Sequence, residues 1–267
     1  MTGWLRDTRR TCTGNADEGM SYMTENNAVT NAADNAANNA ALEADTVTAE
    51  TATTTYERLR ALVHDDWEAA VTHRFVRELV DETIDPDVLR DYLIQDYQFS
   101  EDFLSLLGQV LASADTMKAK VRYAAQLGFI AADEDTYFQD RFAQYGVSED
   151  QILHPELAPA SLGFKKLYTD TIETRSYKDG LAVLVVAESL YLDWAERATD
   201  HGRKLPVKPE HRGWVDVHRG EFFSEWVDFL IAELNRVASA DDPELQERFR
   251  TAVKYERGFF DDAYANR

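Results

Sequence analysis

The sequence predicts a single all-α domain of antiparallel amphipathic helices that follows an N-terminal tail. From Thr54 to the C-terminus, apolar residues recur at the three- and four-residue spacing of an amphipathic helix. The Asp-Pro pairs at 85–86 and 242–243 are helix-start signals, because Asp caps a helix and Pro fits its first turn. No segment alternates polar and apolar residues between turn signals, and no repeat of about 20 to 50 residues occurs. We therefore expect a bundle of about seven helices.

Residues 1–52 differ in composition from the rest of the chain. Thr, Ala, Asn, Asp and Glu dominate them, and large apolar side chains are scarce. Such a segment cannot bury enough apolar surface to offset the conformational entropy lost on ordering. We expect a disordered acidic low-complexity tail at 1–52, with Met23 as an alternative start, and one folded domain at 53–267. The single cysteine, Cys12, lies in the tail.

Caps, apolar stripes and Gly or Pro breaks divide the folded domain into helices. The expected helices cover about 54–80, 86–113, 116–145, 160–175 and 178–201, a segment ending at Val237, and the region from Pro243 to the C-terminus. A loop marked by Gly146, His154-Pro155 and Pro159 precedes the helix at 160–175. The Gly- and Pro-containing connection HGRKLPVKPEHRG (201–213) follows the helix at 178–201.

The charge balance restricts the possible partners. The chain has 28 Lys and Arg against 49 Asp and Glu, a net charge of -21, which argues against nucleic acid or an anionic membrane as partner. The scarcity of Lys among the basic residues resembles proteins from salt-loving organisms. One cysteine excludes an intrachain disulfide. No apolar run approaches the roughly 18 residues that span a bilayer, and no signal peptide is evident, so the expected location is the cytoplasm.

Three helices each place one acid inside a stripe that should be apolar. On the helix at 178–201, Glu188 lies within an arc of roughly 80° whose other members are apolar. Asp96 and Glu256 occupy the same kind of position on the helices at 86–113 and after Pro243. A lone buried carboxylate costs several kcal/mol unless it is paired or neutralised. Each acid therefore lies on a face that is not in fact buried, or forms a structural ion pair, or belongs to a shared cavity for acid–base chemistry. Three acids with aromatic neighbours favour the cavity.

Other kinds of site lack their motifs. Glu-x-x-His pairs, which supply metals in helical bundles, do not occur, so no metal is expected. The folded region has no cysteine, which excludes a cysteine nucleophile. Gly-rich phosphate loops, G-x-S-x-G and G-x-G-x-x-G are missing too, and no cofactor is expected.

Four segments resemble the TenA/thiaminase II family, whose members have the haem-oxygenase-like all-α fold. They are YLIQDYQF (92–99, after HRF at 73–75), AESLYLDWA (187–195), WVDVHRGEFF (214–223) and YERGFF (255–260). The resemblance covers about 55–265 in the family's order and spacing. It implies a TenA-like catalytic domain that acts on a small aminopyrimidine, and a homo-oligomer, a tetramer by family analogy.

The resemblance assigns substrate-binding roles to five residues. Asp96 corresponds to the Asp that binds the aminopyrimidine ring, and Phe99 stands where the family has a tyrosine. An aromatic residue of the short helix matches Phe164, and a late family Phe matches Phe259. His218 replaces the tyrosine that ends the family's W-x-x-x-Y segment.

The resemblance also assigns catalytic roles to Glu188, Glu256 and Tyr191. Ala187 occupies the position of the family's nucleophilic cysteine and is followed at once by Glu188. The chain thus resembles the branch that lacks this cysteine, which is associated with salvage of pyrimidine fragments of degraded thiamine. Thiamine cleavage itself is in doubt, because the thiol is missing.

These observations lead to the hypothesis of a cofactor-free hydrolase of thiamine salvage. It would convert aminomethyl- or formylaminomethyl-pyrimidine towards 4-amino-5-hydroxymethyl-2-methylpyrimidine by carboxylate acid–base catalysis. One alternative is an oxidase or oxygenase of the same fold that resembles the pyrroloquinoline quinone synthesis enzyme, and it would require a basic pocket. The other is a non-catalytic pyrimidine-binding regulator.

Overall fold

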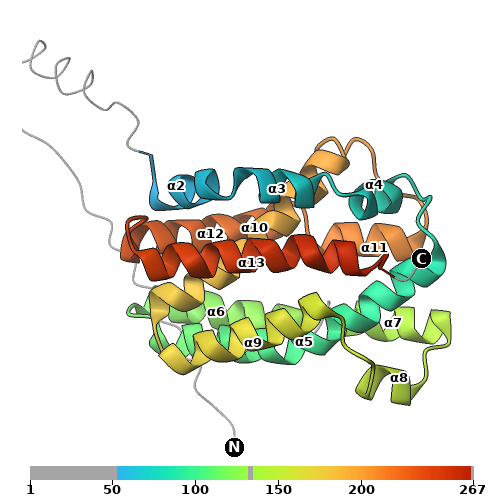
Figure 1. The fold of residues 1–267 in the computed structure, drawn as a ribbon, viewed down its shortest axis with the longest axis horizontal. Coiled ribbons are helices and arrows are strands. Elements are labelled where there is room, and N and C mark those ends of the chain that lie inside the picture. Colours follow the sequence, from blue (N-terminus) through green and yellow to red (C-terminus); the bar gives the residue numbers. More distant parts are fainter. Residues whose placement is uncertain (1–52, 132–134, 266–267) are drawn as a thin grey trace, which may run out of the picture. The chain divides into compact units, whose positions relative to one another are not determined.

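The computed structural model of the protein describes residues 53–131 and 135–265, in which every regular element is a helix (Figure 1). The predicted tail at 1–52, with Cys12, lies outside the described residues. The helices are α2 (Thr55–Leu62), α3 (His64–Val71), α4 (Arg74–Val80), α5 (Pro86–Ser113), α6 (Met117–Phe129), α7 (Asp135–Tyr145), α8 (Glu149–Leu153), α9 (Pro159–Thr174), α10 (Tyr177–Ala198), α11 (Pro209–Val217), α12 (Glu221–Val237) and α13 (Pro243–Asp262). The predicted all-α class is confirmed.

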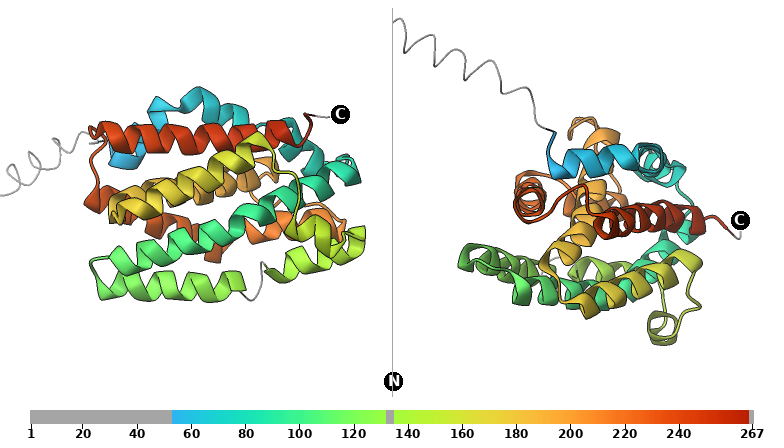
Figure 2. Two further views of the ribbon diagram at one scale, coloured as in Figure 1. Left: turned by 60° about the horizontal axis from the view of Figure 1, so that its bottom comes forward. Right: turned by 60° about the vertical axis from the view of Figure 1, so that its left-hand side comes forward.

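Helix α10 is the central element of the folded domain. It contacts α3, α4, α5, α9, α12 and α13. In Figure 1, α2 to α4 lie above the layer that contains α10, α12 and α13, and α5, α6 and α9 lie below it; Figure 2 shows the same arrangement from two other sides. Because neighbours cover it on several sides, residues 181–186 of α10 are all fully buried. This explains the unbroken apolar run at the start of the helix.

The helix starts predicted from Asp-Pro pairs are confirmed. Asp85 precedes α5, and its side chain accepts a hydrogen bond from the backbone N–H of Asp87 at 2.8 Å. Asp242 caps α13 in the same way through the N–H of Glu244 at 3.0 Å. In both helices Pro occupies the first turn, where no intrahelical donor is lost.

The number of helices exceeds the prediction, because several are short. The helix expected at 116–145 is two helices in the structure, α6 and α7. A single helix was expected because the apolar stripe continues from one to the other. The predicted loop at 146–159 contains α8, which begins with a capping box between Ser148 and Gln151. The predicted connection at 201–213 contains the start of α11. In the described residues, no helix is both long and apolar enough to span a membrane.

We predict that Gly220→Ala destabilises the protein by about 1–3 kcal/mol. Gly220 precedes α12 with φ 84° and ψ 176°, a conformation that side-chain-bearing residues rarely adopt. A Cβ atom there would meet no other atom within 4 Å, so the cost comes from the backbone alone. Urea unfolding of both proteins measures the difference.

Gly108→Ala is the matched control for this substitution. Gly108 lies inside α5, and a Cβ there also meets nothing within 4 Å. Its backbone is helical, so alanine should leave stability equal or raise it by up to about 1 kcal/mol. If the two substitutions changed the free energy of unfolding equally, the backbone conformation at Gly220 would not require glycine.

Candidate functional site

The three predicted interior acids come together at one cavity between the helices. Asp96 from α5, Glu188 from α10 and Glu256 from α13 all line it, and their exposed fractions are 7%, 7% and 3%. The cavity has a volume of about 70 Å³. Each acid stands on a different helix, so the site depends on the packing of α10 against α5 and α13.

Glu256 is an acid whose protonated form the site favours. Burial raises the pKa of its carboxyl group well above the ordinary value, and the negative charges of Asp96 and Glu188 raise it further. Three carboxylates cannot all ionise cheaply in one buried space, so a proton is retained among them. The arrangement therefore offers both a carboxylic acid and carboxylates at one cavity, the combination that acid–base catalysis requires.

The three predicted phenylalanines form two layers. Phe99 lines the cavity directly. Phe164 and Phe259 are 1% and 2% exposed and pack against Phe99, each with its ring centroid 5.2 Å from that of Phe99. A flat ligand would thus meet Phe99 first, while the other two rings hold Phe99 in place.

Tyr191 reaches the cavity from α10, one turn after Ala187 and Glu188, which also line it. Its hydroxyl is 2.6 Å from that of Tyr92, a residue that the sequence analysis did not assign to the site. Burial raises the pKa of both phenols well above the ordinary value, so both stay protonated and act as hydrogen-bonding groups. The ring of Tyr92 packs against Phe75 of the HRF motif, with centroids 4.2 Å apart.

Comparison with known proteins places the chain in a family. The family model described as the TENA/THI-4/PQQC family matches residues 60–266. The chain belongs to this family. Two proteins named aminopyrimidine aminohydrolase are similar to it. The one from Halalkalibacterium halodurans is 21% identical over 226 residues, covering 81% of this chain and 96% of that protein. The one from Bacillus subtilis is 21% identical over 212 residues, covering 78% and 89%.

A solved structure of a TenA homologue confirms the predicted haem-oxygenase-like fold. The structure from Pyrococcus furiosus superposes with a TM-score of 0.68 at 20% identity, covering 79% of this chain and 100% of that one. The TenA resemblance noted in the four motifs is thus confirmed by family and by fold.

His218, which the sequence resemblance assigns to substrate binding, lines the cavity from the end of α11. Its Nδ1 lies 2.9 Å from the carbonyl oxygen of Trp214 one turn earlier in α11. A carbonyl only accepts, so Nδ1 carries the hydrogen and Nε2 keeps a lone pair. Burial lowers the pKa of His218 to about 4. The side chain, which lines the cavity, is therefore a neutral hydrogen-bond acceptor there.

We predict that His218 stays neutral, with the hydrogen on Nδ1, from about pH 5.5 to 8. The reason is that burial disfavours the imidazolium form. Nitrogen-15 NMR of the ring, assigned by loss of its signals in His218→Phe, reports both the tautomer and the protonation state. A midpoint near the ordinary value of about 6.5, or a hydrogen on Nε2, would contradict this assignment.

The sequence analysis missed Gln126, a polar residue that lines the cavity from α6 and is only 2% exposed. A signal was available, because Tyr123, Gln126 and Ile130 fall on one face of the helix and both neighbours are buried. An uncharged amide on a buried face costs less than a carboxylate there, so the sequence pattern alone marks it less clearly. Among the residues that the structure describes, no group of three or more His, Cys, Asp or Glu side chains could hold a metal ion.

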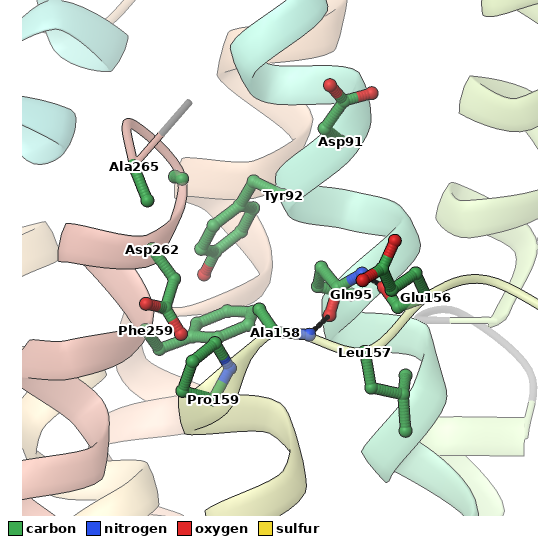
Figure 3. A pocket seen from close by; sticks show the side chains of 11 residues that line it. Asp91, Tyr92, Gln95, Glu156, Leu157, Ala158, Pro159, Phe259, Asp262 and Ala265 are labelled. Atoms are coloured by element: carbon green, nitrogen blue, oxygen red, sulfur yellow. Dashed lines mark hydrogen bonds between the residues drawn. The ribbon is translucent and has the colours of Figure 1, made fainter. Parts of the chain in front are cut away.

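A second hollow, of about 390 Å³, lies beside Tyr92 and Phe259 (Figure 3). Gln95, one of its polar lining residues, is engaged in structural hydrogen bonds. Gln95 accepts from the N–H of Ala158 and donates to the carbonyl of Glu156, both at 2.9 Å. Adjacent residues of the QD motif therefore have different tasks: Gln95 fixes the segment before α9, and Asp96 lines the acid cavity.

Proposed function

We propose that this protein is a hydrolase of thiamine salvage that converts aminomethyl- or formylaminomethyl-pyrimidine towards 4-amino-5-hydroxymethyl-2-methylpyrimidine. The observation that carries the proposal is the meeting of three buried carboxyl groups at one cavity that is also lined by aromatic rings. The aminohydrolase names of relatives at 21% identity support the same reaction class.

Asp96 and Phe99 are the proposed anchors of the pyrimidine. A 4-aminopyrimidine presents a ring nitrogen beside an exocyclic amine, so a single carboxyl group can contact both. The face of Phe99 offers an apolar surface for the flat ring, supported by Phe164 and Phe259 behind it. This pairing fixes the ring and leaves its side arm to the remaining polar groups.

Glu188 and Glu256 are the proposed acid–base pair. A carboxylate at Glu188 would take a proton from water, whose oxygen bonds to the methylene carbon of the side arm. The carbon–nitrogen bond breaks, and the protonated Glu256 donates its proton to the departing nitrogen, which leaves as ammonia. Tyr191 and His218 would hydrogen-bond near the arm, Tyr191 held by Tyr92.

Ala187 supports hydrolysis by water in place of a thiol mechanism. It lines the cavity beside Glu188, at the position where the family resemblance places a cysteine nucleophile. A methyl group cannot attack carbon, so we propose that thiamine, which the cysteine-bearing branch cleaves through its thiol, is a poor substrate.

Incubation of the full chain in high salt with each pyrimidine tests the proposal, with liquid chromatography for the hydroxymethyl product and an enzymatic assay for ammonia. We expect release of both products from the aminomethyl compound and little cleavage of thiamine. Pyrimidine binding without product on prolonged incubation would favour the non-catalytic regulator instead. Oxygen consumption would favour the oxidase alternative, which three acids at the cavity already disfavour.

A further inference from the structure

Gln126 is a buried amide that faces the acid cavity from a helix with no assigned role in catalysis. It is 2% exposed and belongs to α6, which packs on α5. Burying an amide is unfavourable unless its hydrogen-bonding groups find partners. Among the described residues, one end of this amide has a partner and the other end has none.

Arg122 determines the orientation of the Gln126 amide group. Its Nη1 lies 3.4 Å from Oε1 of Gln126, one turn later on α6. A guanidinium only donates, so the oxygen of the amide faces Arg122 and the amino group Nε2 is the other end. Within the described residues, no acceptor takes the hydrogens of Nε2. The guanidinium is itself held over the ring of Trp226, 4.8 Å from its centroid, which keeps the pair in place.

Hydrolysis of an acylated arm needs a donor that keeps its hydrogen throughout the reaction. Asp96, Glu188 and the Nε2 lone pair of His218 are acceptors, the Tyr191 hydroxyl is engaged with Tyr92, and the proton of Glu256 goes to the leaving nitrogen. Tyr168 and Trp214 also bring donors to the cavity, and Gln126 differs from them in having a cation at the far end of its donor group. Hydrolysis of a formamide passes through a tetrahedral species with negative charge on oxygen. In a cavity with three carboxyl groups that charge needs a donor aimed at it. An amide polarised by a cation at its oxygen is a stronger donor at its nitrogen.

We propose that Gln126 is a catalytic residue that donates from Nε2 to the oxyanion formed when the formyl group of formylaminomethyl-pyrimidine is hydrolysed. Water gives a proton to Glu188 as its oxygen bonds to the formyl carbon and the carbonyl electrons move to oxygen. Collapse then re-forms the carbonyl bond and breaks the carbon–nitrogen bond, the nitrogen takes a proton from Glu256, and formic acid leaves, losing its own proton to solvent as formate, beside the aminomethyl product. This inference rests on the proposed function and deepens it, because it assigns one residue of the site to substrates whose side arm carries a formyl group.

Comparison of two substrates on one set of variants tests the role. In Gln126→Met, which keeps the length of the side chain but has no donor, kcat for formate release should fall by about 10²–10³-fold. Ammonia release from the aminomethyl compound forms no carbonyl oxyanion and should fall much less, so the ratio of formate release to ammonia release should drop by at least about tenfold. Gln126→Glu, which keeps the shape of the amide, should show the same selective loss.

Gln109→Met is the matched control, because Gln109 is a half-buried glutamine of α5 whose Nε2 donates to Ser113. It should leave the ratio of the two activities unchanged. Equal losses on both substrates in the Gln126 variants, or full formate release, would overturn the oxyanion role and leave the proposed function standing. A wild-type protein that releases neither formate nor ammonia would overturn both.

Discussion

Glu256→Gln is expected to lower kcat for ammonia release by about 10²–10⁴-fold, the usual contribution of general acid–base catalysis. Burial and the charges of Asp96 and Glu188 raise the pKa of the Glu256 carboxyl group, which suits it to the proposed role of proton donor. Glutamine keeps the shape and a hydrogen-bonding group but cannot release a proton to the leaving nitrogen. Initial rates under saturating substrate measure the effect directly.

The loss of activity in Glu256→Gln should not come from a loss of stability. The direction of the pKa shift of Glu256 determines how the stability difference between variant and wild type changes with pH. Because the folded-state pKa of Glu256 is raised, its contribution to stability is full below the unfolded value of about 4.3 and is lost as pH rises through the folded value. Glutamine does not titrate. The variant should therefore gain stability relative to wild type as pH rises between these values, by up to about 1.4 kcal/mol per pH unit.

Glu247→Gln provides the control, since Glu247 lies on the same helix, α13, with its side chain exposed. It should leave kcat within about twofold of wild type, as surface substitutions usually do. An active Glu256→Gln protein, or one whose stability relative to wild type falls with rising pH, would remove Glu256 from the acid role.

Most of the fold could be predicted from the helical spacing of apolar residues and from the helix caps. Helices α5, α9, α10 and α13 were expected close to their observed bounds, because their caps and stripes are unambiguous. The division of 116–145 into α6 and α7 was not expected, since the stripe runs on in phase across the boundary. A periodic pattern reports which face is buried, and two helices in register present the same pattern as one.

A sequence pattern shows only which residues are buried, and this explains which site residues could be predicted and which could not. Asp96, Glu188 and Glu256 could be recognised because a charge on a buried stripe is costly, and costly features indicate function. Tyr92 was hidden because an aromatic residue on a buried face looks like ordinary core. Its role appears only when α10 brings the hydroxyl of Tyr191 to 2.6 Å from that of Tyr92. The tautomer of His218 likewise depends on a carbonyl that only the structure places.

Asp96→Ala is expected to weaken binding of hydroxymethylpyrimidine by about 10²–10⁴-fold. The estimate follows from loss of two hydrogen bonds to a charged group, each contributing about 1.5–3 kcal/mol. Titration calorimetry measures the dissociation constant without turnover. Asp102→Ala is the control, because Asp102 lies on the same helix but pairs with Lys165 at 2.5 Å. Binding by Asp96→Ala within about threefold of wild type would remove Asp96 from ring recognition.

Asp96→Asn reveals the protonation state of the bound ring. An amide can donate to a neutral ring nitrogen and accept from the exocyclic amine, whereas a carboxylate needs a proton on that nitrogen. The acid-rich surroundings of Asp96 favour a protonated ring, because Glu188 and Glu256 share the cavity. We therefore expect Asp96→Asn to recover only part of the affinity that is lost in Asp96→Ala. The affinity of the wild type should fall as pH rises, while that of Asp96→Asn should stay constant. Full recovery by asparagine would instead mean that the ring binds neutral and that Asp96 holds the proton.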